Sequence, residues 1–185
     1  MFSSADRSYS GNAFKDIRSC VSRSVRELKR HDENFDTIVV SGVSGLMIGP
    51  SVAMKMGKHL CVIRKREEKS HSSRKWEGTV GDRFIFLDDF ICVGDTMKSA
   101  VTGVRKAWRA EMMGYGDSWS ESEIDERFQA SGPVFAGMFS YVHSEFTTPA
   151  NLRTYLNGYL SSIRLDHDDY MSVLDCGVSS DPGYW

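Results

Sequence analysis

One stretch of the chain, residues 84–96, restricts the possible folds most strongly because it joins an apolar run, two carboxylates, a glycine and a helix start. The apolar run, residues 84–87, is typical of a strand covered on both faces in a parallel sheet. Asp88 and Asp89 follow directly, at the carboxyl end of this strand, where open α/β sheets bind their ligands. The stretch therefore predicts an α/β fold with a polar site at one sheet edge.

A helix is predicted to begin near Asp95 or Thr96. Apolar residues recur beyond this point at helical spacing, namely Met97, Val101, Val104 and Trp108. The free N–H groups of the first turn, with Gly94 and the Thr96 hydroxyl, can bind a phosphate or another anion. Asp88 and Asp89 are expected to accept hydrogen bonds from sugar hydroxyls or to organise a divalent cation. This pattern indicates a phosphorylated sugar, although a strand-turn-helix with a solvated Asp pair would show it too.

Length and charge fit one ordinary globular domain over residues 1–185. The net charge of -2 gives no general case for nucleic acid or anionic membranes as partners. Apolar runs stay well short of the roughly 20 residues that a membrane span requires. The polar start is not a secretory signal, and the 4 cysteines are widely spaced, as suits reduced thiols. We therefore expect a cytoplasmic protein with no membrane partner and no nucleic-acid partner.

A second strand-loop-helix corner lies upstream. Residues 36–40 read as a buried strand, followed by a glycine-flanked loop at 41–45 and a helix whose first turn would suit Pro50. A tight turn without a ligand would give the same pattern. The corner is therefore a second candidate ligand site. Its pattern alone is weak evidence, and the site predicted at residues 84–96 strengthens it.

A third strand at residues 59–63 leads into the most basic and polar segment of the chain, residues 64–78. This segment has no apolar periodicity and is predicted to be a mobile loop. A cationic loop can close over a bound anion, stabilise growing negative charge and exclude water. A solvated charge run and a local nucleic-acid patch remain alternatives.

The remaining patterns complete an α/β domain. A fourth strand is predicted at residues 134–141, and helices are predicted at 13–30, 121–130 and 148–163. Alternating strands and helices favour a mostly parallel twisted sheet of about five strands flanked by helices. If the first strand lies between the second and third, the loop at 41–45 lies beside the turn at 88–96. The core would then span about residues 13–165.

The stretch 84–96 resembles the phosphoribosyl pyrophosphate (PRPP) signature of the type I phosphoribosyltransferases: four apolar residues, two acidic ones, a turn with Gly, then Thr. The run 45–50, a Gly, three apolar residues and Gly-Pro, is similar to the adenine-type, purine branch of that family. The pair Arg64 and Lys65 after an apolar strand is similar to the family's pyrophosphate-binding pair. The resemblance spans roughly residues 36–110.

This resemblance implies a role for each stretch. Asp88 and Asp89 would be the catalytic pair that holds the ribose hydroxyls. The residues implied to wrap the 5-phosphate are Cys92, Val93, Gly94, Asp95 and Thr96. Those implied to bind pyrophosphate are Val43, Ser44, Gly45, Arg64 and Lys65. The flexible loop would carry Arg66, Lys69, His71, Arg74 and Lys75.

Three positions depart from the family pattern. Ser44 replaces a basic residue, and Val93 replaces a threonine that donates to the phosphate. Asp95 stands where glycine is common. An Asp95 side chain pointing outward would be harmless, whereas one pointing inward would weaken phosphate binding.

The resemblance further implies transfer of the ribose 5-phosphate of PRPP to a nucleobase, with a purine favoured and pyrophosphate released. Mg²⁺ would bind through PRPP near Asp88 and Asp89, with no direct protein ligand. A homodimer is expected, with a small hood formed by the chain ends, residues 1–12 and 166–185. The alternative is a catalytically silent PRPP-binding regulator or subunit, which Ser44, Val93 and Asp95 favour.

Overall fold

The computed structural model describes residues 16–65, 75–90, 94–113, 119–156, 159–160 and 163–174. A 6-stranded sheet forms its centre, in the order β3-β2-β1-β4-β5-β6. The strands are β1 Thr37–Ser41, β2 His59–Ile63, β3 Trp76–Gly78, β4 Arg83–Asp88, β5 Val134–Ser140 and β6 Glu145–Thr147. The four central strands are parallel, and β3 and β6 pair antiparallel at the edges. The predicted fold class is confirmed.

The four predicted strands all form, and β1 lies between β2 and β4 as the predicted order required. The short strands β3 and β6 were not predicted individually. The prediction of a loop throughout 64–78 is wrong at its end, because Trp76–Gly78 pairs with β2. A strand of three residues is too short to show alternation in sequence, so only its partner reveals it.

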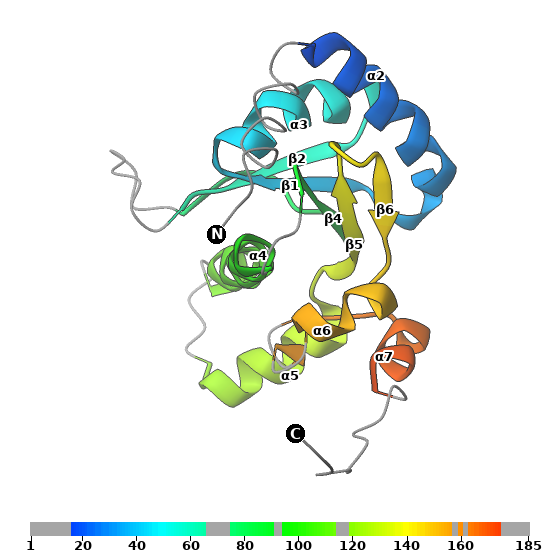
Figure 1. Ribbon diagram of the computed structural model, residues 1–185. Helices are drawn as coiled ribbons and strands as arrows, with labels where there is room; N and C mark the ends of the chain where they lie inside the picture. The colour runs from blue at the N-terminus through cyan, green and yellow to red at the C-terminus, as the bar shows by residue number, and fades with distance from the viewer. Residues whose placement is uncertain are drawn as a thin grey trace, which may run out of the picture.

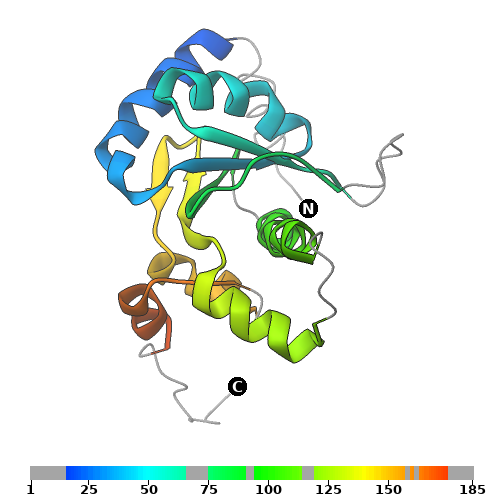
Figure 2. The same cartoon turned by 180° about the vertical axis from the view of Figure 1, so that it is seen from behind.

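Helices cover both faces of the sheet. They are α2 Ile17–Leu28, α3 Gly42–Met56, α4 Asp95–Met113, α5 Glu121–Ser131, α6 Arg153–Leu156 and α7 His167–Leu174, with 3-10 turns η1 Lys29–Asn34 and η2 Ala150–Leu152. Figure 1 shows α2 and α3 on one face and α4 to α7 on the other, and Figure 2 shows the same layers from behind. Among the described residues, no helix is long and apolar enough to cross a membrane.

Strand alternation divides the core between these two layers. Ile38 and Val40 of β1 pack with α2 and α3, whereas Val39 between them packs with α4. The same division holds in β4, where Ile85 and Phe86 point to opposite faces. The continuous apolar runs in the sequence thus reflect strands buried on both sides, as predicted.

The first predicted loop is already helical. Helix α3 begins at Gly42, immediately after β1, so Pro50 lies inside the helix and the prediction that it occupies the first turn is wrong. Gly42 has φ 70°, a left-handed conformation that lets the chain turn at once from strand to helix. Pro50 is exposed and has no N–H to donate to the carbonyl of Leu46 one turn earlier.

The predicted helix at 148–163 is not one continuous α-helix. Helix α6 is described as far as Leu156, and residues 157–158 and 161–162 lie outside the described residues. Tyr159 is not helical, and Ile163 is followed by Arg164, which bridges to Val134 of β5. Leu156 and Ile163 are both buried. The apolar pattern therefore predicted the burial of Leu156 and Ile163 correctly, although only Leu156 lies in a described helix, and Tyr159 of the same pattern is 39% exposed.

The start of the tail is attached to the sheet. The Arg83 guanidinium donates two hydrogen bonds to the Asp166 carboxylate, at 2.8 and 2.5 Å, and this pairing raises the pKa of Arg83. Most of the predicted hood, residues 1–12 and the end of the tail, lies outside the described residues.

Helix α3 approaches β1 closely because its inner face is made of small residues, Gly45, Gly49 and Ala53, spaced by four. A Cβ at Gly49 would lie 2.5 Å from Cγ1 of Val40, and one at Gly45 would lie 2.9 Å from Cβ of Val40. The buried Val40 side chain leaves no room for it. These glycines therefore set the distance between helix and sheet.

Gly49→Ala should destabilise the fold despite the better helix propensity of alanine, because the added methyl group overpacks the contact with Val40. We expect a loss of about 1–3 kcal/mol in the free energy of unfolding, measured with urea. The double variant Val40→Ala with Gly49→Ala should lose less than the sum of the two single variants. Additive losses would show that this contact does not set the packing.

Candidate functional site

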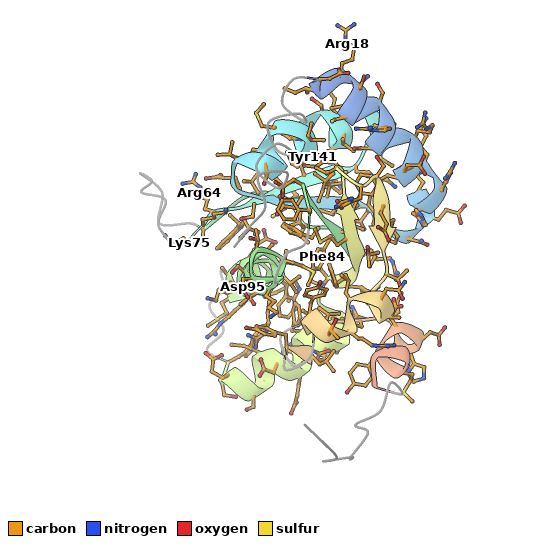
Figure 3. All side chains as sticks on the ribbon, in the orientation of Figure 1. Arg18, Arg64, Lys75, Phe84, Asp95 and Tyr141 are labelled. Carbon is orange, nitrogen blue, oxygen red and sulfur yellow. The ribbon has the colours of Figure 1, made fainter. Side chains whose placement is uncertain are left out.

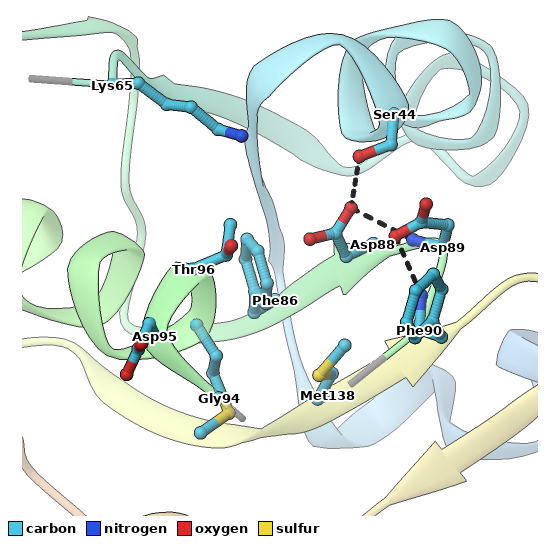
Figure 4. A pocket seen from close by; sticks show the side chains of 11 residues that line it. Ser44, Lys65, Phe86, Asp88, Asp89, Phe90, Gly94, Asp95, Thr96 and Met138 are labelled. Atoms are coloured by element: carbon cyan, nitrogen blue, oxygen red, sulfur yellow. Dashed lines mark hydrogen bonds between the residues drawn. The ribbon is translucent and has the colours of Figure 1, made fainter. Parts of the chain in front are cut away.

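A cavity of about 260 Å³ lies at the carboxyl end of β4, beside the first turns of α3 and α4 (Figure 4). Predicted site residues from three separate stretches of sequence meet in its wall: Ser44, Lys65, Asp88, Asp89, Gly94, Asp95 and Thr96. The other lining residues are Phe86, Phe90, Met97 and Met138. The strand order thus brings both predicted ligand corners to one site.

The Asp88 carboxylate is the most buried polar group of the site, with 5% of the residue exposed. Its Oδ1 accepts hydrogen bonds from the Ser44 hydroxyl at 2.5 Å and from the Asp89 N–H at 3.0 Å. Its other oxygen points to the side of the cavity where Thr96 and Lys65 lie (Figure 4). Burial raises the pKa of Asp88 to about 6; nearby Asp89 adds to the rise, and the Ser44 hydrogen bond opposes it.

The end of β5 holds the backbone of the acidic pair in place. The Ser140 hydroxyl donates to the Asp89 carbonyl at 2.6 Å, and the Tyr141 N–H donates to the Asp88 carbonyl at 3.0 Å. The buried Tyr141 also donates its phenol hydrogen to the Ser44 carbonyl at 3.3 Å, between the layers (Figure 3). The sequence analysis did not predict the roles of Ser140 and Tyr141. Their only mark in the sequence is that an apolar strand ends in polar residues.

The Lys65 side chain reaches the cavity by passing close over Gly42. A Cβ at Gly42 would lie 2.6 Å from Cε and 2.9 Å from Nζ of Lys65. A larger residue at position 42 would therefore displace the only cation among the residues that line the cavity. The sequence placed Gly42 in a turn but did not reveal this second role.

Arg64, the other member of the predicted pyrophosphate pair, is not a lining residue. Its guanidinium forms a salt bridge with Glu77 of β3, and its side chain lies at the outer edge of the sheet (Figure 3). Successive residues of an extended chain point to opposite sides, so Arg64 and Lys65 cannot both face the cavity in this conformation.

The other predicted pyrophosphate residues lie in the first turn of α3. Val43 points outward with 70% exposure, and Gly45 is buried against Val40. Ser41, the N-cap, makes no side-chain capping bond, since its hydroxyl donates to the Ile63 carbonyl at 2.8 Å. The backbone N–H groups of this turn are therefore the ones suited to meet an anion.

The second anion corner begins at Gly94, whose φ is 78° and whose Cβ, if present, would lie 2.8 Å from Cδ1 of Tyr155. Helix α4 starts at the next residue, with Thr96 in its first turn. The Asp95 side chain is 77% exposed and its carboxylate lies 3.8 Å from Nζ of Lys98. Asp95 therefore points outward, the harmless alternative for a phosphate site.

Several predicted residues lie outside the described part of the chain: Cys92, Val93, Arg66, Lys69, His71 and Arg74. Lys75 is described and is exposed at the base of the predicted loop. Its carbonyl accepts a hydrogen bond from the Arg64 N–H at 2.8 Å, next to the pairing of β2 with β3.

The cavity has a polar end and an apolar end. Phe90, which is 39% exposed, and Met138 lie on the other side of Asp88 from Lys65 (Figure 4). Sequence reasoning missed both as lining residues, since an apolar residue in a turn or strand is more often core. The arrangement suits a ligand with an anionic part and a flat apolar part.

Carboxylates outnumber cations in the cavity wall even without the outward-pointing Asp95, with Asp88 and Asp89 against Lys65. Among the described residues, no three His, Cys, Asp or Glu side chains gather as metal ligands. Two carboxylates at a strand end suit Mg²⁺ that is held chiefly by the phosphates of a ligand. The indirect magnesium site stays a prediction, for which Asp88 and Asp89 are the available carboxylates.

Asp88 should make the fold less stable as the pH rises. Its pKa is about 6 in the folded protein and about 3.9 in an unfolded chain, so the unfolded state releases this proton first. The stability difference between wild type and Asp88→Asn should shift by roughly 2–3 kcal/mol between pH 4 and 7, against wild type. Urea unfolding at each pH measures this shift.

Ser44→Ala is the companion variant, because losing the hydroxyl raises the pKa of Asp88 further. The decline in stability should then continue to a higher pH than in wild type. Parallel pH profiles for wild type and Asp88→Asn would contradict the burial of a titrating carboxyl at this position.

No protein-family model matches the chain. It is 32% identical over 89 residues to a hypoxanthine/guanine phosphoribosyltransferase of Methanocorpusculum labreanum, covering 40% of this chain and 48% of that protein. It is 28% identical over 105 residues to the transcriptional regulator GfcR of Methanocaldococcus jannaschii, covering 52% and 48%. The matches thus span about half the length of these curated relatives.

Among solved structures, the chain is similar to adenine phosphoribosyltransferase from Leishmania tarentolae, with 15% sequence identity and a TM-score of 0.45. That similarity covers 82% of this chain and 68% of the other. The resemblance predicted from residues 84–96 is confirmed by the sequence matches: this chain is similar in sequence to the purine phosphoribosyltransferases.

Proposed function

We propose that this protein is a phosphoribosyltransferase, which transfers the ribose 5-phosphate of PRPP to a ring nitrogen of a purine base and releases pyrophosphate. The observation that carries the proposal is the single cavity in which the acidic pair at the end of β4 meets Lys65 and the first turn of α4. Its polar and apolar ends correspond to the phosphates and the base.

PRPP would lie across the carboxyl ends of β1 and β4. The first turn of α4, with the Thr96 hydroxyl, would bind the 5-phosphate. The first turn of α3 and the Lys65 ammonium would bind the pyrophosphate. Asp88 and Asp89 would accept hydrogen bonds from the ribose hydroxyls between these two anionic ends.

Magnesium is central to this proposal because the cavity is electrostatically unsuited to a bare polyanion. Two carboxylates, Asp88 and Asp89, face it against one lysine, so an unscreened PRPP would be repelled. Mg²⁺ bound with the ligand near Asp88 and Asp89 would neutralise part of the ligand's charge. Near neutral pH, above the pKa of about 6, Asp88 is mostly ionised and can favour a cation close by.

The reaction would follow from the same geometry. The bond between ribose C1 and the pyrophosphate oxygen breaks, and its electron pair leaves with pyrophosphate. The base nitrogen forms the new bond to C1 and loses its proton to the departing pyrophosphate or to water. Asp88 and Asp89 would stabilise positive charge developing on the sugar, and Lys65 would stabilise the leaving group. Phe90 and Met138 would form the apolar wall against the base.

Binding of PRPP should depend on the acidic pair and on magnesium. Asp88→Asn combined with Asp89→Asn should abolish PRPP binding in calorimetry, since both ribose acceptors lose their charge, while a thermal unfolding transition remains. Wild type should bind PRPP with Mg²⁺ and only weakly without it. Unchanged affinity in the folded double variant would refute the site.

Lys65→Ala should weaken PRPP binding by about tenfold to a hundredfold, as expected for loss of a charge-assisted hydrogen bond. Arg64→Ala is the matched comparison, because Arg64 pairs with Glu77 instead of lining the cavity. Calorimetric titrations of both variants should show the larger loss for Lys65. Equal losses would mean that Arg64 turns toward the ligand.

A second candidate function is a PRPP-binding regulator without transferase activity. The similarity to a protein named as a transcriptional regulator favours it, as does Ser44, whose hydroxyl is engaged by Asp88 where the family carries a basic residue. A screen for pyrophosphate release with hypoxanthine, guanine, adenine and xanthine separates the two. Release with one base supports the transferase, whereas magnesium-dependent PRPP binding without release supports the regulator.

A further inference from the structure

Gly94 is part of the cavity wall, but it has no side chain to fix its conformation. Its φ of 78° lies in the left-handed region, which glycine adopts without strain. The Gly94 carbonyl accepts a hydrogen bond from the Lys98 N–H at 2.9 Å, in the first turn of α4. The conformation of Gly94 therefore affects the direction in which this turn points. Because glycine is free to adopt other conformations as well, a neighbouring group has to hold it in this one.

The Tyr155 side chain of α6 packs directly against Gly94. A Cβ on Gly94 would lie 2.8 Å from Cδ1, 3.2 Å from Cβ and 3.3 Å from Cγ of Tyr155. These distances are shorter than ordinary contacts between carbon atoms, so Tyr155 prevents the backbone at Gly94 from moving toward α6. Tyr155 itself is not one of the residues that line the cavity. It therefore supports the cavity wall from behind, through Gly94.

Other residues anchor α6 to the core. Leu152 and Leu156 are buried in the same apolar cluster as Met97 and Val101 of α4. Tyr155 lies between the two leucines in sequence, is only half-buried, and packs at the edge of this cluster. The contact with Gly94 is thus made by a side chain that the core does not need to keep α6 in place.

A second aromatic contact reaches the same turn of α4. The Lys98 ammonium lies 4.9 Å from the centre of the Tyr159 ring, and its Nζ lies 3.8 Å from the Asp95 carboxylate. Tyr155 and Tyr159 are four residues apart, as are Gly94 and Lys98. A cation–π contact near the surface is weak, so Tyr155 provides the main restraint and Tyr159 adds to it.

We propose that Tyr155 is a positioning residue for the 5-phosphate site: it holds Gly94, and with it the first turn of α4, in the conformation that receives the phosphate. The inference rests on the proposed function and extends it to a residue that does not touch the ligand. Binding groups that move by about 1 Å lose much of their effect. A loose Gly94 would therefore weaken this end of the site and leave the pyrophosphate end, at α3 and Lys65, unaffected.

Calorimetric titration of each variant with two separate ligands, ribose 5-phosphate and magnesium pyrophosphate, tests the proposal. Tyr155→Ala should weaken binding of ribose 5-phosphate by about tenfold and change binding of pyrophosphate by less than about twofold. Tyr155→Phe should restore wild-type affinity, because the contact uses Cβ, Cγ and Cδ1 and not the hydroxyl. Tyr170→Ala is the matched control, since Tyr170 is 42% exposed on α7, and it should bind both ligands as wild type does.

Gly94→Ala is the second variant, because its methyl group would push against the Tyr155 ring from the other side. It should show the same selective loss, and circular dichroism establishes that each variant is folded. Unchanged binding of ribose 5-phosphate in folded Tyr155→Ala would overturn the inference, and so would equal losses for both ligands, which indicate general destabilisation. Either result leaves the proposed function standing. A wild type that binds neither PRPP nor ribose 5-phosphate would instead refute the proposed function, and this inference with it.

Discussion

The hydrogen bond from the Ser44 hydroxyl to the buried Asp88 carboxylate joins the two corners on which the site depends. A buried carboxylate without partners is costly, so Asp88 requires a donor close to the end of β4. Ser44 can supply it only because β1 and β4 are parallel neighbours and α3 starts directly after β1. Tyr141 closes the arrangement from β5 by donating to the Ser44 carbonyl. The order of the strands, the start of α3 and the geometry of the site therefore depend on one another.

The glycines of α3 connect this site to the packing of the core. Gly45 and Gly49 let the helix lie close against Val40, which brings its first turn to the end of β4. Beside them, Ile48 and Val52 are buried in the same layer, whereas Val43 and Met54 are exposed. A helix with bulky residues in place of these glycines would stand further from the sheet and would separate Ser44 from Asp88. Close packing of α3 is therefore a condition of the site geometry.

The balance of charged side chains in the cavity matters more for the proposed chemistry than any single contact. A cavity with more carboxylates than cations is suited to hold a sugar with developing positive charge, but needs a metal ion to accept the phosphates. Ser44, in place of a basic residue, reduces the positive charge available to pyrophosphate. The proposed geometry would therefore suit either transfer or sensing.

The sequence by itself determined the four central strands, the acidic pair at a strand end and the start of α4, because these follow from local periodicity and turn chemistry, but not the short edge strands β3 and β6. It also carried the resemblance to phosphoribosyltransferases. Only the tertiary structure decided that Lys65 and not Arg64 lines the cavity, that Tyr141 supports Ser44, and that α3 starts at Gly42. Each of these features depends on contacts between residues far apart in sequence, or on the side of the strand to which a residue points. A local sequence pattern does not encode such contacts.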